Sequence, residues 1–308
     1  MFKFSADHHF VIGRDHVLQA KPCQDHALSF AQDDLAIAVV SDGCSSGGET
    51  DMGARMLTFT LINTIKKMRK IADDTPLSKS PAHIRFAQWI MLKEAVGLLG
   101  FSAHDALATC TYAYLTPSGG YVHLRGDGVI ALRFRDGSST LLRYDWDNNM
   151  PFYPAYADDG PRGYDCFIEA HGGSLLKEVF KEEEWMERPG RVCAKVSETM
   201  HSLSAGIQGR VIPFSRDELA NMASISVFTD GVTQVDGVDW KDTVIQLLDF
   251  KTTEGAFVKR RMNRLLKDYR KRGDEPSDDI ACAVVLIDCN DEKGEDYERA
   301  ETPPENNT

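Results

Sequence analysis

The sequence lacks any apolar run that approaches the roughly 20 residues needed to cross a membrane as a helix. Its first nine residues contain no apolar core, so we expect no signal peptide. Basic residues are also few, with 35 Lys and Arg against 47 Asp and Glu and a net charge of -12. A nucleic-acid partner is therefore not expected, because phosphate backbones are bound by clustered Lys and Arg. We predict a cytoplasmic protein with no membrane partner.

The seven cysteines form no CxxC pair and match no zinc-ligand spacing. Four of them lie in or beside apolar stretches, namely Cys110, Cys193, Cys282 and Cys289. We interpret these four as reduced, buried thiols, which agrees better with the cytosol than with an oxidising compartment.

What the sequence does contain is a set of four acidic turns, each next to an apolar run. They are Asp42-Gly43, Asp127-Gly128, Asp230-Gly231 and Asp278-Asp279. A carboxylate beside a buried strand is costly to place unless its charge is compensated. Several carboxylates at one sheet edge would need cations, and oxygen ligands favour Mg²⁺ or Mn²⁺ over zinc. The alternative for a single Asp-Gly is an ordinary turn, and we interpret Asp136-Gly137 and Asp236-Gly237 in that way.

The N-terminal half predicts a strand followed by two helices. The continuous apolar run from Leu35 to Ser41 predicts a fully buried strand. Apolar residues at helical spacing predict a helix over 50–70, with Thr50 as its N-cap. A second helix is expected over 84–99. A chain of 308 residues can bury one large core, so a single domain is expected.

Short strands separated by turn residues are expected around and after these helices. A first hairpin is predicted from 10–12 and 27–30, and a β-meander from 106–115, 120–124, 129–134 and 139–144. Two sets of strands with paired helices predict an α+β sandwich of two antiparallel sheets with helices outside.

The last part of the chain is mixed. Residues 145–173 predict either a long ordered loop or a mobile flap that faces the substrate. Short helices are expected over 175–187 and 244–248. A basic helix is expected over 256–272, and its charge forms either a solvated face or a docking site for an acidic partner. We expect its apolar residues to face inward, and these are Leu265, Leu266 and Tyr269.

The order of the motifs resembles that of the metal-dependent Ser/Thr protein phosphatases of type 2C (PPM), in their bacterial form. The resemblance covers residues ~5 to ~288 and depends on the set of motifs rather than on any one of them. The matching segments are Lys21-Pro22-Cys23-Gln24-Asp25, Val40-Ser41-Asp42-Gly43, Ala106-Leu107-Ala108-Thr109, Gly126-Asp127-Gly128, Phe228-Thr229-Asp230-Gly231 and Asp278-Asp279-Ile280-Ala281.

The resemblance implies a fold and a function. The fold would be a four-layer sandwich of two central antiparallel sheets flanked by helices. The catalytic domain would span 1–290, and 291–308 would be an acidic, disordered tail. The implied activity is hydrolysis of phosphoserine and phosphothreonine in proteins by a water that bridges two Mn²⁺ or Mg²⁺ ions. Such an enzyme would act in signalling, would oppose a Ser/Thr kinase and is expected to be a monomer.

The resemblance also implies roles for individual residues. Asp42 would bridge the two metals, and the carbonyl of Gly43 would bind the second. Asp230 and Asp278 would bind the first metal, although Asp279 could exchange roles with its neighbour. The remaining roles are those of Asp25, which would orient metal-bound waters, Asp127, which would bind a third metal, and Gln24, which stands where some relatives have a metal-binding Glu.

Two departures from the family pattern leave roles open. The family's phosphate-binding Arg corresponds to Ala20 here, and the adjacent Lys21 is the main replacement, with Arg14 and His16 as further candidates. Cys44 stands where animal relatives have a His proposed as general acid, and we interpret it as a packing residue. His16 or a metal-bound water could then protonate the leaving group.

Two alternative functions follow from the same sequence. One is a regulatory pseudophosphatase or scaffold that keeps the fold without the metals. The other is a metal-dependent phosphatase of small phosphate esters. The retained acids argue against the first, because loss of a ligand would be expected in a pseudoenzyme.

Overall fold

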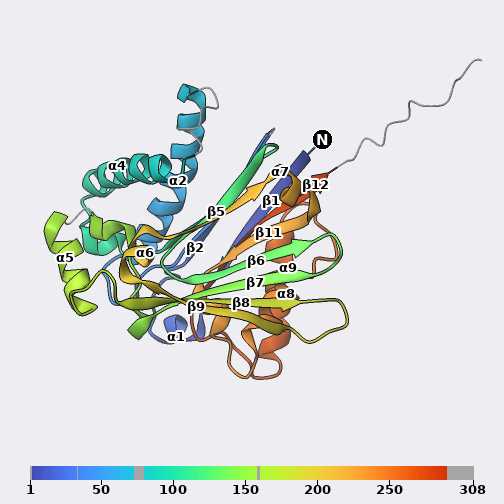
Figure 1. Cartoon of the computed structure of the whole chain (residues 1–308). Coiled ribbons are helices and arrows are strands. Elements are labelled where there is room, and N and C mark those ends of the chain that lie inside the picture. The colour runs from blue at the N-terminus through green and yellow to red at the C-terminus, as the bar shows by residue number, and fades with distance from the viewer. Residues whose placement is uncertain (1, 33, 73–79, 158–159, 290–308) are drawn as a thin grey trace, which may run out of the picture.

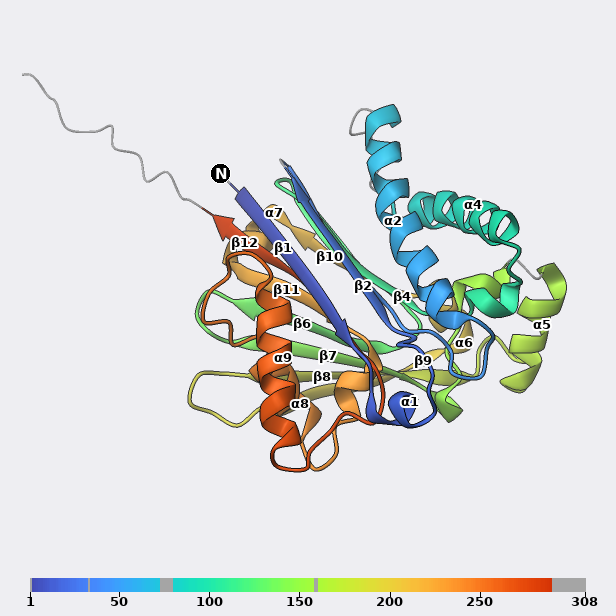
Figure 2. The same cartoon turned by 180° about the vertical axis from the view of Figure 1, so that it is seen from behind.

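The structure is a computed structural model that describes residues 2–32, 34–72, 80–157 and 160–289. Two antiparallel sheets lie face to face, and helices cover both outer faces (Figures 1 and 2). The predicted α+β sandwich is therefore confirmed. The acidic tail lies outside the described residues, so the domain boundary near residue 290 stays a prediction. No described helix is long and apolar enough to cross a membrane.

Over the described residues, the larger sheet has seven strands in the order β1-β12-β11-β6-β7-β8-β9. In chain order its strands are β1 (Phe2–Val11), β6 (Gly128–Phe134), β7 (Ser139–Trp146), β8 (Glu178–Glu187), β9 (Ala194–Ser202), β11 (Met222–Phe228) and β12 (Ile280–Cys289). The smaller sheet has the order β10-β5-β4-β3-β2. Its strands are β2 (His26–Gln32), β3 (Leu35–Ser41), β4 (Cys110–Thr116), β5 (Gly119–Arg125) and β10 (Arg210–Ser215).

The helices lie on the outer faces and at the sheet ends. They are α1 (Arg14–Leu18), α2 (Thr50–Ala72), α4 (Pro81–Leu99), α5 (Gly160–Ala170), α6 (Leu203–Gln208), α7 (Arg216–Asn221), α8 (Trp240–Leu247) and α9 (Phe257–Arg270). Short 3₁₀ turns occur at η1 (Ala103–Ala106), η2 (Asp147–Asn149), η3 (Pro154–Ala157) and η4 (Asp230–Thr233). Helices α2 and α4 cover the smaller sheet, and α8 and α9 cover the larger one (Figure 2).

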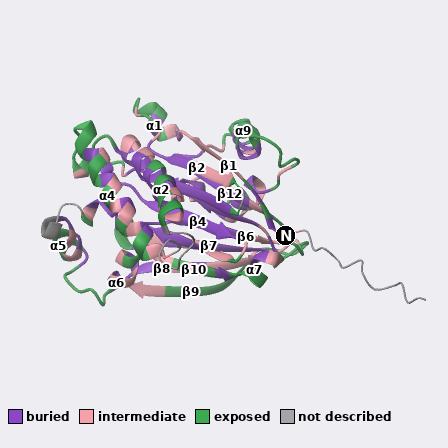
Figure 3. Ribbon diagram, turned by 90° about the horizontal axis from the view of Figure 1, so that it is seen from above, coloured by how far each residue is buried: buried purple, intermediate pink, exposed green. Residues whose placement is uncertain are grey.

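Strand β3 explains why the central strands are apolar at every position. Its residues Ala36, Ala38 and Val40 face the core between the two sheets. The alternate residues Ile37 and Val39 face α2 and α4. Both faces of the strand are buried, so no position favours a polar side chain. Figure 3 shows the central strands buried, whereas β9 at the free edge is exposed along much of its length.

Several predicted elements are confirmed with small shifts. The helix expected over 50–70 is α2, and that expected over 84–99 is α4, which begins at Pro81. Proline suits the first turn of a helix, where its missing N–H is not needed. The basic helix is α9, and its residues Leu265, Leu266 and Tyr269 are buried as expected. Thr50 is the first helical residue of α2 rather than its N-cap.

Other predictions were wrong. Residues 10–12 and 27–30 form no hairpin, because β1 pairs with β12 in one sheet and β2 pairs with β3 in the other. The four strands after α4 are not one meander, because the chain changes sheets between β5 and β6. Residues 178–187 form strand β8 rather than a helix, and its pairing with β7 and β9 decides this. The segment 145–173 contains η2, η3 and α5 rather than only loop.

Candidate metal centre

The predicted acids meet at one end of the sandwich because strand ends from both sheets converge there. Asp42 follows β3, and Asp127 lies in the turn by which the chain crosses from β5 to β6. Asp230 follows β11 after one intervening residue, Thr229, and Asp278 lies shortly before β12. Phe228 pairs with both Val129 of β6 and Cys282 of β12. The turns that carry Asp127, Asp230 and Asp278 are therefore neighbours at one end of the larger sheet.

The acids influence one another strongly. Burial, followed by the charges of Asp230 and Asp278, raises the pKa of Asp42 well above its ordinary value. Burial and the charges of Asp230 and Asp42 do the same to the pKa of Asp127. Burial and Asp278 raise the pKa of Asp230 to about 6. These shifts have the same two causes, which are the burial of each carboxylate and then the repulsion between neighbouring anions.

The side chains present fit a hard cation. Among the described residues, no Lys or Arg forms an ion pair with Asp42, Asp127, Asp230 or Asp278. The Oδ1 atom of Asp127 and the Oε1 atom of Gln24 are buried without a hydrogen-bond partner. Unpaired buried oxygen atoms are costly, and a bound Mg²⁺ or Mn²⁺ would satisfy them. The predicted donor set is therefore chemically consistent with these metals.

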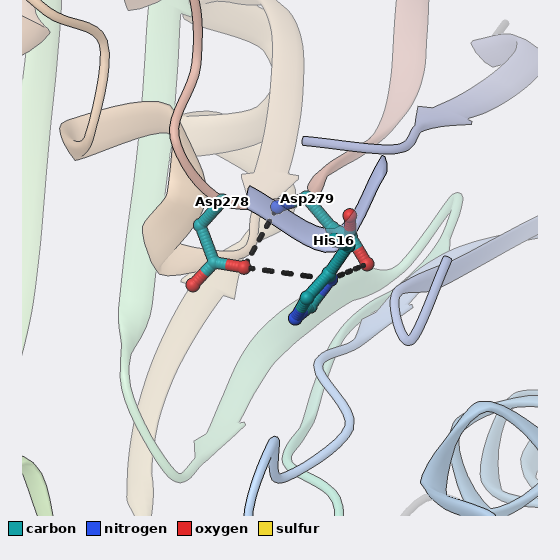
Figure 4. A group of neighbouring side chains, drawn as sticks. All are labelled: His16, Asp278 and Asp279. Atoms are coloured by element: carbon teal, nitrogen blue, oxygen red, sulfur yellow. Dashed lines mark hydrogen bonds and ion pairs between the residues drawn. The ribbon is translucent and has the colours of Figure 1, made fainter. Parts of the chain in front are cut away.

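Asp278 and Asp279 have different environments, and this bears on which of them binds metal. The buried Asp279 accepts backbone N–H bonds of 2.6 Å from both Gly13 and Gln24, and its Oδ2 lies 2.9 Å from Nδ1 of His16. Asp278 is more exposed and lies 4.0 Å from the same nitrogen (Figure 4). These three side chains also form a compact group that could hold an ion. The bonds already made by Asp279 favour Asp278 as the ligand.

Sequence analysis missed Gln234, which contacts both predicted ligands of the first metal. Its Nε2 donates to Oδ2 of Asp230 at 2.9 Å and to Oδ2 of Asp278 at 3.3 Å. The only signal in the sequence is its position four residues after Asp230. A glutamine in a turn is common, so that signal could not have distinguished it.

Asp25 is buried and lies close enough to Asp42 for the two charges to interact. Its Oδ2 accepts a 2.6 Å hydrogen bond from the hydroxyl of Thr229, which directly precedes Asp230. The Thr229 hydroxyl in turn accepts a hydrogen bond from the backbone N–H of Ala281. Burial and the charge of Asp42 raise the pKa of Asp25. The carboxylate is thus fixed on one side and faces Asp42 on the other.

The turn at Gly43 is closely packed. A Cβ atom at this position would lie 2.7 Å from the backbone oxygens of both Gln24 and Thr50, so only glycine fits. Gln24 donates from Nε2 to the hydroxyl of Thr50, which donates to the carbonyl of Cys44. The turn is thereby attached to the start of α2. No hydrogen bond among the described residues uses the carbonyl of Gly43, which leaves it available as a ligand.

The candidates for binding phosphate differ in position. Nζ of Lys21 lies 3.3 Å from the carbonyl of Ser45, in the loop that follows Gly43. Arg14 is paired with Asp236 and with Asp15, so its guanidinium already has two carboxylate partners. The ring of His16 is buried against Asp279. Phosphate binding by Lys21 stays a prediction, and His16 is held by Asp279.

Cys44 packs beside Tyr153, a second residue near the acids that sequence analysis missed. Its Sγ lies 3.1 Å from the Ser46 hydroxyl, and the side chain packs against the apolar cluster that contains Tyr153. Burial, followed by the charges of Asp42 and Cys44, raises the pKa of Tyr153. This phenol comes from the segment 145–173, which therefore does contribute a side chain near the acids.

Comparison with known proteins agrees with this arrangement. The family model of protein phosphatase 2C matches residues 12–149. No curated protein matches the sequence. The catalytic domain of the serine threonine protein phosphatase PstP, solved with two manganese ions, is 17% identical with a TM-score of 0.51, over 93% of this chain and 99% of that one. For Stp1 from Staphylococcus aureus the identity is 13% and the TM-score 0.54, over 93% and 96% of the chains.

A bacterial serine phosphatase gives a similar result, with 11% identity and a TM-score of 0.51 over 93% of this chain and 99% of that chain. At these identities the solved structures establish the fold, and the family model adds the sequence motifs of the N-terminal part. The predicted resemblance is confirmed: the chain has the fold of the bacterial type 2C protein phosphatases, and its residues 12–149 match that family in sequence.

Proposed function

We propose that this protein is a Mn²⁺- or Mg²⁺-dependent phosphatase that hydrolyses phosphoserine and phosphothreonine in proteins. The observation that carries the proposal is the group of acids at the sheet ends. They have raised pKa values, and among the described residues no Lys or Arg pairs with them. Such a group is unfavourable to the fold by itself, which supports a role in holding cations.

Asp42, the Gly43 carbonyl, Asp230 and Asp278 are the groups that would hold two ions, and Asp127 would contribute to a third. Bound ions of this kind neutralise phosphoryl oxygens and make water a better nucleophile at neutral pH. The strands fix the positions of the ligands, because Asp42, Asp230 and Asp278 all lie next to buried strands. The residues thus provide oxygen donors at fixed positions, as hard cations require.

The other residues of the site position the reactants. Thr229 holds one oxygen of Asp25, so the second oxygen can orient the attacking water by accepting its hydrogen. Lys21 lies beside the loop after Gly43 and would attract the substrate phosphate as a point charge. The neighbouring Asp279 and His16 keep the segment of Asp278 against α1.

A direct test is hydrolysis of p-nitrophenyl phosphate and of a phosphoserine peptide with Mn²⁺, Mg²⁺ or EDTA. We expect turnover with either metal and none in EDTA. Alkylation of thiols should leave activity intact, because no cysteine lies in a CxxxxxR motif. Full activity in EDTA, or loss of activity in Cys44→Ser with metals still bound, would contradict the proposal.

The same assay separates protein substrates from small ones. A protein phosphatase should turn over the phosphopeptide efficiently, whereas a phosphatase of small esters should prefer free phosphoserine. Equal or better turnover of free phosphoserine would replace the proposed substrate class and leave the metal chemistry in place.

A further inference from the structure

The amide of Gln234 lies between the two carboxylates proposed to share the first metal. Its Nε2 is 2.9 Å from Oδ2 of Asp230 and 3.3 Å from Oδ2 of Asp278. Among the described residues, no other side chain donates to both of these carboxylates. A neutral N–H₂ group therefore lies where two anionic oxygen atoms converge.

The backbone of Gln234 holds the side chain in this position. Its N–H donates to the carbonyl of Gly231 at 3.0 Å, which fixes it to the turn that follows Asp230. Its carbonyl accepts hydrogen bonds from both the N–H and the hydroxyl of Ser277, each at 3.0 Å. Gln234 is thus attached both to the segment of Asp230 and to the segment of Asp278. Its amide reaches both carboxylates as a result of this double attachment.

An amide is suited to this position in two chemical states. With no cation present, its N–H groups stabilise two carboxylates that repel each other. A cation between the same carboxylates would repel the N–H groups. Rotation of the terminal amide by about 180° exchanges Nε2 for Oε1, and an amide oxygen is a good ligand for Mg²⁺ and Mn²⁺.

We propose that Gln234 is an additional ligand of the first metal and binds it through Oε1. When the site is empty, the N–H groups of the same amide stabilise the two carboxylates in place of the metal. The inference depends on the metal site of the proposed function, and it assigns that site a ligand that no motif predicts. Binding of the first metal would then exchange two hydrogen bonds for one metal–oxygen bond.

The test is calorimetric titration of the metal-free protein with Mn²⁺ alone, for the wild type and for Gln234→Met. Methionine has a similar length but carries no amide oxygen or N–H. We expect Gln234→Met to weaken Mn²⁺ binding about 10- to 100-fold, the usual effect of removing a group that supports a metal. It should also lower the melting temperature in EDTA, because the two carboxylates lose their shared donor.

For Gln234→Glu we expect the opposite change in Mn²⁺ binding in the same titration. A third carboxylate should tighten Mn²⁺ binding and lower the melting temperature in EDTA, because repulsion between the acids increases. Gln246→Met, on α8, is the matched control and should leave Mn²⁺ binding unchanged. If Gln234→Met does not fold, the result for Gln234→Glu decides the question.

Unchanged Mn²⁺ binding by Gln234→Met would overturn the inference, because the amide would then not be a ligand. Tighter Mn²⁺ binding would overturn it as well, because the amide would then only block the site. Unchanged binding by Gln234→Glu would also overturn it, as would a wild type that binds no Mn²⁺. A wild type that binds Mn²⁺ without hydrolysing phosphate would contradict the proposed function alone, since the titration would still measure the role of Gln234.

Discussion

Asp42 connects the acids on the two sides of the candidate metal centre. The charges of Asp230 and Asp278 raise the pKa of Asp42, and its own charge raises the pKa of Asp25 and of Asp127. A carboxylate that faces all of these groups is suited to bridge two cations. The same position makes the charge of Asp42 unfavourable in the metal-free protein.

We expect Asp42→Asn to reduce phosphatase turnover by at least about a hundredfold, or ~3 kcal/mol of transition-state stabilisation. The variant should bind at least one metal ion fewer by calorimetry. Without metal it should be more stable than the wild type by roughly 1–3 kcal/mol, because repulsion among the acids is relieved.

Asp136→Asn is the control for Asp42→Asn, because Asp136 lies in an exposed Asp-Gly turn away from the acids. It should leave both metal binding and turnover unchanged. Two bound ions and near-wild-type turnover in Asp42→Asn would mean that the assignment of the site is wrong.

We expect Asp127 to affect the rate of turnover rather than the binding of the two main metal ions. It lies between β5 and β6, and its Oδ1 is buried without a partner. We predict that Asp127→Ala leaves two ions bound and the fold intact but slows hydrolysis. Turnover measured across Mn²⁺ concentrations checks this. Identical curves for variant and wild type would mean that the third site is absent or has no role.

At the scale of the elements, α4 offers a test of how local conformation contributes to stability. Gly97 lies inside this helix, and a Cβ atom built there would meet nothing within 4 Å. Gly97→Ala should therefore raise the free energy of unfolding by about 0.5–1 kcal/mol, because alanine loses less backbone entropy in a helix. Chemical denaturation measures the change.

Gly43→Ala should have the opposite effect on stability from Gly97→Ala. Its Cβ atom would lie 2.7 Å from two backbone oxygens, so the variant should be destabilised by roughly 1–3 kcal/mol. Stabilisation by Gly43→Ala, or a loss of stability in Gly97→Ala, would contradict the local geometry described above.

The wrong prediction of a helix over 175–187, where the structure has strand β8, has a physical cause at the scale of the elements. Its sequence, Glu-Val-Phe-Lys-Glu-Glu-Glu-Trp-Met-Glu, is rich in Glu and Lys, which favour helices. Val179 and Phe180 are buried in the core between the sheets, and the charged residues form ion pairs with neighbouring strands, as in Glu183 with Lys195. Hydrogen bonds to β7 and β9 thus override local propensity.

At the scale of the whole molecule, we predict that stability in EDTA depends on pH through the acids. The pKa of Asp230 is about 6 in the folded protein, above its ordinary value of 3.8. The folded state therefore binds more protons than the unfolded state between these values. The contribution of Asp230 to the stability of the fold is fully present below pH 3.8 and is lost as the pH rises through about 6.

The buried, neutral histidines have the opposite effect and must be separated from the acids. Burial lowers the pKa of His26 to about 4 and of His123 to about 3, so they favour folding as the pH rises toward 6.5. Neither histidine is a proposed metal ligand, so we expect both to contribute equally with and without metal. The difference in unfolding free energy between Mn²⁺ and EDTA therefore isolates the acids.

We expect the Mn²⁺-minus-EDTA difference in unfolding free energy to grow by about 1–3 kcal/mol between pH 5 and pH 8. Urea denaturation at a series of pH values measures it. The growth should be smaller in Asp42→Asn, which has one charge fewer in the cluster. A difference that does not change with pH would exclude an uncompensated acid cluster as its cause.

The sequence alone predicted the cluster of acids and determined most of the fold class. Acids next to buried strands require compensation wherever those strands lie, so Asp42, Asp127, Asp230 and Asp278 could be identified without coordinates. Helices α2, α4 and α9 were predictable because their apolar spacing is local to each segment.

Only the tertiary structure decided the features that depend on partners distant in the chain. Pairing with β12 separated β1 from β2, and pairing with β7 and β9 made β8 a strand. The contacts of Asp279 with Gly13 and His16, and of Gln234 with Asp230 and Asp278, join segments that the sequence does not connect. Such contacts depend on where strand ends meet in space, and a pattern along one segment carries no information about that meeting point.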